Sequence, residues 1–312
     1  MPEPRPFNVS FAFPQRTGEP APGTRHAPHP RAQRTAGSEP PRLTIALTFD
    51  FDAFSAQVDR GDGPYARSTG EYGVRVGLPR VLGLLARHEI HSTFFVPGHA
   101  AATFPASVAA IVAGGHELAC HGWVHEDVAC LGEAAERDIL IRSREALQAV
   151  SGRPPIGYRA PFWSLSERTL GLVEEAGFGY DSSLAWDDFR LSRVRHDDRH
   201  ERDRSVLGPT GRLVEVPVSR LLADWLHFEP GPGAGGGAAP SAVEEIWLEE
   251  LRYAHASVPG GLITFTLHPE TIGRGSRIAM LERLISAARE LPGVVFSRLD
   301  VAVASWVVTH GP

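Results

Sequence analysis

Two aspartates, Asp50 and Asp52, end a segment in which apolar residues alternate with small or acidic ones. Residues 43–52 read Leu-Thr-Ile-Ala-Leu-Thr-Phe-Asp-Phe-Asp. Because successive side chains of a strand point to opposite faces, one face is apolar and the other carries both carboxylates. This pattern is typical of a β/α-barrel strand, whose C-terminal end lies at the mouth where barrel enzymes place their chemistry. An ordinary half-buried strand followed by an Asp-rich turn is the alternative for this segment alone.

Two histidines four residues apart, His121 and His125, follow a second strand-like segment. Imidazoles at this spacing can face one metal ion. With 14 histidines among 312 residues, chance can produce such a pair, and the chain has another, His196 and His200. The second pair lies in a charged run without a scaffold, so His121 and His125 are the ligand candidates.

Asp52, His121 and His125 together make a set of two histidines and one carboxylate. Such a set suits a catalytic zinc or a similar divalent ion, and it also occurs in non-haem Fe(II) oxygenases. A hydrolase additionally needs a base beside the activated water. Asp50 offers that base, whereas the oxygenase interpretation leaves this second carboxylate unexplained.

Three more polar residues end strand-like segments. His268 closes the segment 262–268, whose Thr-lined face repeats the first pattern, and this favours a general acid over a core histidine. Arg159 and Asp181 would be costly inside a barrel unless they are paired. We therefore expect Arg159 to orient Asp50 and keep it ionised, with Asp181 holding Arg159.

Strand-like and helix-like segments alternate along the body of the chain. The predicted strands are 43–50, 92–97, 117–121, 156–161, 178–183, 213–218, 262–268 and 294–299. The predicted helices are 78–88, 105–114, 132–150, 166–177, 241–257 and 277–291. This order predicts an α/β fold with parallel strands, a distorted barrel of seven or eight β/α units, with a doubly wound open sheet as the alternative.

The chain divides into a leader and one catalytic domain. Residues 1–41 are rich in Pro, Arg and Gly without an apolar period, and we expect a disordered or loosely docked segment. The barrel domain spans 42–312. The charged run 193–204 is expected to be a solvated loop, and the glycine-rich run 231–239 a flexible insert.

Composition narrows the class of protein. A hydrophobic content of 42% and a charged content of 22% indicate a globular chain with a sizeable core. A net charge of −6 gives no electrostatic case for nucleic acid or for an anionic membrane. No apolar run approaches a membrane span, and no secretory signal opens the chain. The two cysteines fit a reducing compartment, so we expect a cytoplasmic protein, with a homo-oligomer left open.

The ordered set of motifs resembles the polysaccharide deacetylase superfamily, carbohydrate esterase family 4, over about residues 42–306. The motifs are the Asp pair, His-x-x-x-His, the Arg-x-Pro-Phe segment that begins at Arg159, the loop with Asp181, and Leu-His at His268. The resemblance implies a distorted barrel and a divalent metal, commonly zinc, with Co²⁺, Mn²⁺ and Fe²⁺ as alternatives.

Carried over by position, the family's roles fall on residues of each motif. Asp50 is the implied base and His268 the implied acid, while Arg159 orients the base. The implied metal ligands are Asp52, His121 and His125. The backbone N–H near Phe162 is implied to help stabilise the oxyanion.

Several details are similar to a cytoplasmic branch of this family, which contains peptidoglycan-deacetylase-like proteins, allantoinases and cyclic-imide hydrolases. They are the Asp-Phe-Asp spacing, the segments 71–77 and 180–184, and His-Pro followed by Gly-Arg and Arg277. The segment 217–225 is also similar, although Ala223 replaces the first member of an acidic pair. Members of this branch cleave amides in sugars, ureides or imides, and some of its allantoinases dispense with metal.

The sequence therefore predicts a metal-dependent hydrolase of non-peptide C–N bonds, most simply an N-deacetylase of an N-acetylated amino sugar. A cyclic imide or ureide hydrolase is the alternative within enzymes, and a non-catalytic glycan- or partner-binding barrel is the alternative of another class. The expected partner is a small-molecule or glycan-derived amide. Seven residues are candidate pocket residues, with packing an equal interpretation for most: Glu71, Arg75, Trp123, Phe162, Trp163, Asp224 and Trp225.

Overall fold

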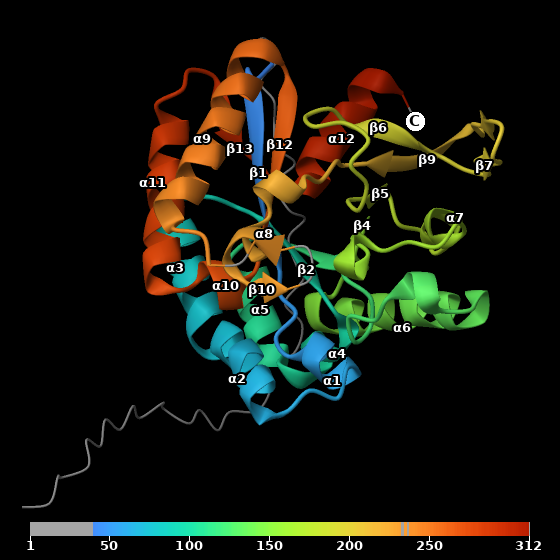
Figure 1. The fold of residues 1–312 in the computed structure, drawn as a ribbon, viewed down its shortest axis with the longest axis horizontal. Coiled ribbons are helices and arrows are strands. Elements are labelled where there is room, and N and C mark those ends of the chain that lie inside the picture. The colour runs from blue at the N-terminus through green and yellow to red at the C-terminus, as the bar shows by residue number, and fades with distance from the viewer. Residues whose placement is uncertain (1–39, 232–233, 236, 312) are drawn as a thin grey trace, which may run out of the picture. The chain divides into compact units, whose positions relative to one another are not determined.

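A curled, largely parallel β-sheet forms the centre of the fold (Figure 1). The computed structural model describes residues 40–231, 234–235 and 237–311, so the predicted leader lies almost wholly outside the described residues. The strand order along the sheet is β12-β1-β2-β3-β4-β5-β9-β6, and β13 pairs with β1 beside that path. Only β6 and β9 pair antiparallel in this sheet of the described chain.

The strands of the central sheet are β1 (Leu43–Asp50), β2 (Thr93–Val96), β3 (Glu117–Cys120), β4 (Gly157–Tyr158), β5 (Tyr180–Asp181), β6 (Ser192–Arg195), β9 (Thr210–Glu215), β12 (Gly261–Leu267) and β13 (Val294–Phe296). Two small hairpins are formed by β7 (Arg199–His200) with β8 (Ser205–Val206), and by β10 (Pro230–Gly231) with β11 (Ala234–Gly235).

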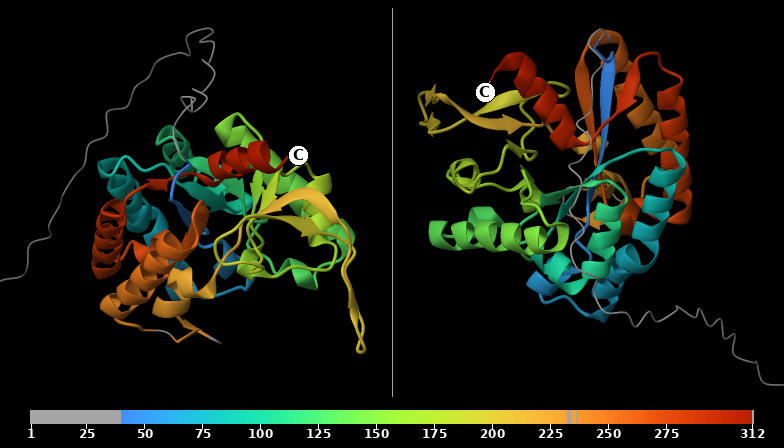
Figure 2. Two further views of the ribbon diagram at one scale, coloured as in Figure 1. Left: turned by 90° about the horizontal axis from the view of Figure 1, so that it is seen from above. Right: turned by 180° about the vertical axis from the view of Figure 1, so that it is seen from behind.

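The α-helices are α1 (Ser55–Asp59), α2 (Pro64–Tyr72), α3 (Leu78–Arg87), α4 (Gly98–Thr103), α5 (Pro105–Ala113), α6 (Glu133–Ser151), α7 (Thr169–Glu175), α8 (Asp224–Phe228), α9 (Pro240–Ser257), α10 (Pro269–Ile272), α11 (Gly275–Arg289) and α12 (Leu299–His310). A π-helix, η1 (Gly73–Gly77), joins α2 to α3, and short 3-10 turns are η2 (Val128–Cys130), η3 (Pro161–Trp163) and η4 (Arg220–Leu222). Helices α3, α9 and α11 lie together on the β1–β12 side, whereas α6 lies on the β3 side (Figures 1 and 2). No helix in this described part of the chain is long and apolar enough to cross a membrane.

Strand β1 has the two faces that its alternation predicts. Leu47, Phe49 and the following Phe51 belong to the outer core, which packs against the helices. Ala46 belongs to a separate inner core together with Phe95 of the neighbouring strand. Because Phe51 points outward, the residues on either side of it share the interior face at the carboxyl end of the strand.

The free edge of β12 is met by loops rather than by a further strand. The N–H of Leu262 donates to the carbonyl of Phe189 (2.8 Å), and Thr266 forms an isolated parallel bridge with Ala223. These contacts bring the segments that flank β6 and α8 against β12. The predicted distorted barrel is therefore confirmed as a curled sheet whose gap is closed by loop contacts.

The predicted strands and helices correspond to observed elements, with boundaries that differ by a few residues. The charged run 193–204 is not the plain loop that we expected, because it holds β7 and part of an antiparallel ribbon that projects from the body (Figure 1). The glycine-rich run 231–239 includes part of the β10–β11 hairpin and three positions outside the described residues. The C-terminal helix α12 was not predicted.

Helix α12 is held against the amino ends of the strands by a buried carboxylate. Glu117 accepts hydrogen bonds from the hydroxyls of Thr93 (2.6 Å) and Tyr180 (2.8 Å) and from the N–H of Asp300 (2.9 Å) in the first turn of α12. Burial, with the charge of Asp300 adding to it, raises the pKa of Glu117 to about 7. The folded chain therefore binds a proton here that the unfolded chain, with a pKa near 4.5, has already lost.

This linkage predicts a pH-dependent difference in stability between the native protein and Glu117→Gln. The pKa of Glu117 is higher in the folded chain than in the unfolded one, so proton binding by Glu117 stabilises the folded chain. This stabilisation is complete below the unfolded pKa and is lost as pH rises towards about 7. We expect the free energy of unfolding of the native protein, relative to the variant, to fall by up to about 3 kcal/mol between pH 4.5 and 7.5. Urea unfolding across this range measures it, and a constant difference would contradict the prediction.

Candidate active site

Loops at the carboxyl ends of β1 and β3 bring together three buried side chains of the kinds that can ligate a metal. The Nε2 atom of His121 lies 3.7 Å from Oδ1 of Asp52, and Nε2 of His125 lies 3.4 Å from Oδ2 of Asp52. One ligand atom from each residue can be chosen so that all three lie within 4.8 Å of one another. It is the one such group of at least three His, Cys, Asp or Glu residues among the residues with described positions.

The protonation states of this group fit a cation. The Nδ1–H of His121 donates to the carbonyl of Arg159 (2.7 Å), which leaves the lone pair of Nε2 facing the carboxylates. Burial lowers the pKa of His121, and it lowers that of His125 to about 4, so both imidazoles are neutral at neutral pH. The lone pair of Nε2 of His121 therefore faces a carboxylate oxygen, and Oδ1 of Asp52 is buried without a hydrogen-bond partner among the described atoms. A divalent cation satisfies all three groups at once.

Asp50 lies beside this group but has a different partner. Its Oδ1 atom accepts a hydrogen bond from Nη1 of the fully buried Arg159 (2.6 Å), while its Oδ2 atom lies 3.8 Å from Nε2 of His121 and 3.9 Å from Nε2 of His268. Burial raises the pKa of Asp50, but the charge of Arg159, together with that of His268 and the hydrogen bond from Arg159, outweighs it and holds that pKa below its ordinary value. The predicted placement of Arg159 on Asp50 is confirmed.

His268 is oriented by a carboxylate to which the sequence assigned another role. Asp224, at the first position of α8, is fully buried and accepts hydrogen bonds from Nδ1–H (2.7 Å) and from the backbone N–H (2.8 Å) of His268. Burial lowers the pKa of His268, but the charge and hydrogen bond of Asp224 outweigh it and raise that pKa to about 10. Asp224 is therefore a partner of the histidine and not a residue of the pocket wall.

Asp181 does not hold Arg159 through a hydrogen bond, and this part of the prediction is wrong. Its carboxylate accepts from the hydroxyl (2.8 Å) and the N–H (3.0 Å) of Ser183. Arg159 instead donates to the carbonyl and the hydroxyl of Ser182, both at 3.0 Å. The reason is the alternation of side chains: the peptide that follows Asp181 faces the guanidinium, while the carboxylate points towards its own turn.

The two histidines of the cluster lie on a loop and not on a helical turn. Gly122 and His125 both have positive φ angles, 69° and 65°. Glu126, which the sequence analysis did not single out, accepts hydrogen bonds from the N–H groups of Trp123 (3.1 Å) and Val124 (2.6 Å). These bonds fix the loop, so both imidazoles point at Asp52.

Backbone strain concentrates around the same site. Among the described residues, six other than glycine have positive φ, and four of them belong to site loops: Ala53, His125, Phe162 and Trp163. Such conformations cost about 1–3 kcal/mol each and persist only where the surroundings enforce them. The ring of Phe162 meets that of His125 edge-on with centroids 4.3 Å apart, which places this ring against the ligand group.

The remaining predicted pocket residues divide into two groups. Phe162 and Trp225 are 56% and 39% exposed, and they follow Arg159 and Asp224 closely in sequence, so they flank the mouth. Trp123 instead packs under the guanidinium of Arg142 (3.8 Å). Trp163 is half-buried in the η3 turn, whereas Glu71 and Arg75 are exposed on α2 and η1, with no hydrogen bond joining them to the described site residues.

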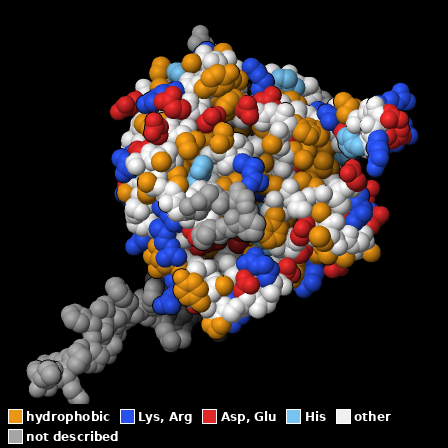
Figure 3. Space-filling view, viewed as in Figure 1, with side chains coloured by type: hydrophobic (Ala, Val, Ile, Leu, Met, Phe, Trp, Pro, Cys, Tyr) orange, Lys and Arg blue, Asp and Glu red, His pale blue; other side chains and the backbone are white. Residues whose placement is uncertain are grey.

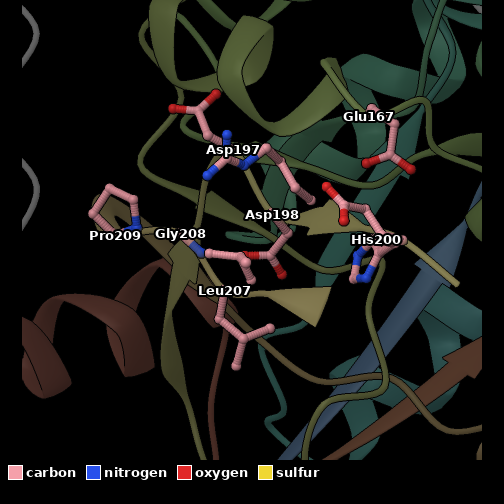
Figure 4. A pocket seen from close by; sticks show the side chains of 10 residues that line it. Glu167, Asp197, Asp198, His200, Leu207, Gly208 and Pro209 are labelled. Atoms are coloured by element: carbon pink, nitrogen blue, oxygen red, sulfur yellow. The ribbon is translucent and has the colours of Figure 1, made fainter. Parts of the chain in front are cut away.

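The other histidine pair belongs to no group of three metal-ligand side chains among the described residues. His196 bonds to Glu174 (2.9 Å) and His200 to the hydroxyl of Ser205 (2.9 Å). A cavity of about 890 Å³ at this ribbon is lined by several of its polar residues together with Glu167 (Figure 4), but by no residue of the mouth. Acidic and basic side chains are interspersed over the face of the molecule that Figure 3 shows.

Comparisons with known proteins agree with this geometry. The family model described as polysaccharide deacetylase matches residues 37–180. A crystal structure from Mycobacterium smegmatis that carries the polysaccharide deacetylase name is 33% identical, with a TM-score of 0.75 over 89% of this chain and 94% of that one. The peptidoglycan deacetylase of Helicobacter pylori is 29% identical over 81% of this chain and 92% of its own length. The structure of Puue allantoinase (24% identity, TM-score 0.73, covering 92% of this chain and 100% of that one) shares the fold.

The ligand group predicts that His121→Ala abolishes stoichiometric binding of a divalent metal. Loss of one of three protein ligands leaves an incomplete set, and Asp52 and His125 alone cannot define the site. Metal content after dialysis should fall from about one ion per chain to near zero. His200→Ala, outside the site, should retain the metal, and equal metal content in both variants would contradict the ligand assignment.

The hydrogen bond between Asp224 and His268 predicts a shift in the pH profile of turnover. The Asp224 carboxylate raises the pKa of His268, so Asp224→Asn should lower that pKa and move the alkaline limb of kcat/KM to lower pH. Metal content should stay unchanged, since Asp224 is not in the ligand group. An alkaline limb at the native position would show that His268 is not the titrating group.

Proposed function

Because the chain belongs to the polysaccharide deacetylase family, we propose that it is a metal-dependent N-deacetylase that hydrolyses the acetamide of an N-acetylated amino sugar. The observation that carries the proposal is the convergence of three functional groups at one mouth. They are the ligand group around Asp52, the ionised Asp50 on Arg159, and the protonated His268 on Asp224. A metal-assisted amide hydrolysis needs these components: a bound ion, a base and an acid.

Asp52, His121 and His125 would hold the ion, and we propose Zn²⁺ because two imidazoles and one carboxylate are a ligand set that zinc prefers. When bound, the ion lowers the pKa of a water molecule and polarises the acyl carbonyl. The carbonyl of Arg159 fixes the tautomer of His121, so that Nε2 is the atom offered to the metal.

Asp50 is the proposed base. Its Oδ1 atom is occupied by Arg159, whereas Oδ2 faces His121 and His268 and remains available. The low pKa that Arg159 imposes keeps the carboxylate ionised, so Oδ2 can accept the proton of the attacking water. The water oxygen then bonds to the acyl carbon.

His268 is the proposed acid. Its Nδ1–H is donated to Asp224, so the second proton of the imidazolium lies on Nε2, 3.9 Å from Asp50. Transfer of this proton to the amide nitrogen allows the C–N bond to break, with acetate and the free amine as products. The N–H of Phe162 is the proposed donor to the oxyanion, because Phe162 lies in a strained turn and its ring contacts that of His125.

A sugar substrate is supported by the mouth and by the relatives. Phe162 and Trp225, close in sequence to Arg159 and Asp224, present exposed aromatic rings, and such rings supply rigid apolar contact area for a cyclic ligand. The Helicobacter pylori relative is a peptidoglycan deacetylase, so an amino sugar of peptidoglycan is the first substrate to test. The complete set of base, ligands and acid argues against a non-catalytic barrel.

The test is turnover of the zinc-loaded protein on N-acetylated peptidoglycan fragments and on cyclic imides, with acetate release and ring opening measured in parallel. We expect acetate release. Asp50→Asn should retain the metal and lose about 10²-fold or more in kcat, as for a missing general base, while Asp59→Asn at an exposed position of α1 should match the native protein. Ring opening without acetate release, or full turnover by Asp50→Asn, would overturn the proposal.

A further inference from the structure

Three glycines share one face of a helix that contacts both the loop carrying Asp52 and the segment that follows His268. Helix α2, the π-helix η1 and α3 run without a break in helical backbone conformation from Pro64 to Arg87. Gly70, Gly73 and Gly77 follow at intervals of three and four residues, so they fall on the same side of the helix. All three are buried.

Gly70 packs directly on the loop that carries Asp52. A Cβ atom at this position would lie 2.1 Å from the carbonyl oxygen of Ala53 and 2.7 Å from Cα of Phe54. Ala53 is the residue after Asp52, it has a positive φ of 51°, and it is fully buried. Backbone therefore meets backbone, and no side-chain rotation can make room for a methyl group.

Gly77 packs in the same way on the segment that follows His268, and Gly73 packs on the side chain of Glu270 in that segment. A Cβ atom on Gly77 would lie 2.0 Å from the carbonyl oxygen of Pro269, and one on Gly73 would lie 2.9 Å from Oε2 of Glu270. The contact is mutual, since a Cβ atom on Gly273 would lie 2.5 Å from Cα of Gly77.

Two further features secure this contact. The hydroxyl of Tyr72 donates to the carbonyl of Gly273 (3.1 Å), and Nη1 of Arg80 donates to the same carbonyl (3.1 Å). Pro79 has no N–H to donate to the carbonyl oxygen four residues earlier, and its ring crowds that carbonyl. The π-helix η1, whose turn is wider than that of an α-helix, directly precedes α3, which contains Pro79. The π-helix is thus the part of the helix that faces α10.

We propose that Gly70 and Gly77 are positioning residues that set the metal group and the acid relative to each other. Gly70 fixes the backbone next to Asp52, Gly77 fixes the backbone next to His268, and one rigid helix joins the two contacts. The inference rests on the proposed function, because it links Gly70 to metal binding by Asp52 and Gly77 to proton donation by His268.

The experiment compares Gly70→Ala, Gly77→Ala and the matched control Gly83→Ala. Gly83 lies in α3, further along the same continuous helix, and a Cβ atom there would meet only Nη1 of Arg87 at 3.8 Å. We expect Gly70→Ala to weaken zinc affinity of the apoprotein by about 10- to 100-fold, measured by competition with a chromogenic chelator. Gly77→Ala should keep that affinity and the KM while kcat falls by about 10²-fold.

Tyr72→Phe is the second variant, since it removes one hydrogen bond to Gly273 without adding an atom and preserves folding. It should lower kcat with zinc affinity unchanged. The proposal is overturned if Gly77→Ala loses zinc affinity as Gly70→Ala does, or if both variants match Gly83→Ala. If neither glycine variant folds, it is overturned when Tyr72→Phe has the same kcat as the native protein. A native protein that binds zinc but turns over no substrate would instead overturn the proposed function, and the affinity difference between the glycine variants would still test the placement of Asp52.

Discussion

The guanidinium of Arg159 is a permanent charge with 0% exposure, and the geometry of the mouth depends on how it is satisfied. Its donors reach Asp50 and Thr48 of β1 and the Ser182 peptide and hydroxyl after β5. These bonds join β1 to the ends of β4 and β5, across the interior of the curled sheet, through one side chain. Removal of one partner from a buried ion pair costs about 3–5 kcal/mol, so Asp50 is both fixed and ionised before any substrate arrives.

The same constraint separates two aspartates that are only two residues apart. Asp50 has a cation within the protein, whereas burial raises the pKa of Asp52 and the charge of Asp50 adds to that effect. Asp52 therefore gains most from a bound metal ion, and Asp50 keeps a free oxygen for a proton. Two carboxylates with such different surroundings can take two different roles. The intervening Phe51 is buried in the outer core, so both carboxylates lie on the opposite, interior face.

The sequence predicted the strands and the residues at their carboxyl ends because both follow from short-range alternation. It did not reveal the role of Asp224, since this residue reaches His268 across 44 positions through the contact between Ala223 and Thr266. It assigned the wrong partner to Asp181, because the direction of a side chain at the end of a two-residue strand depends on the following turn. The π-helix was also missed, as its cause is a proline inside a helix whose period otherwise looks regular.

The arrangement separates the chemistry from the choice of substrate. Asp50 and His268 are held by buried partners, Arg159 and Asp224, whose hydrogen bonds do not involve the rim. The exposed rings of Phe162 and Trp225 take no part in those bonds, so the rim can change while the proposed proton donor and acceptor stay in place. A fold with buried partners and a variable rim can serve different substrates, and structures named as a polysaccharide deacetylase and as an allantoinase share this fold.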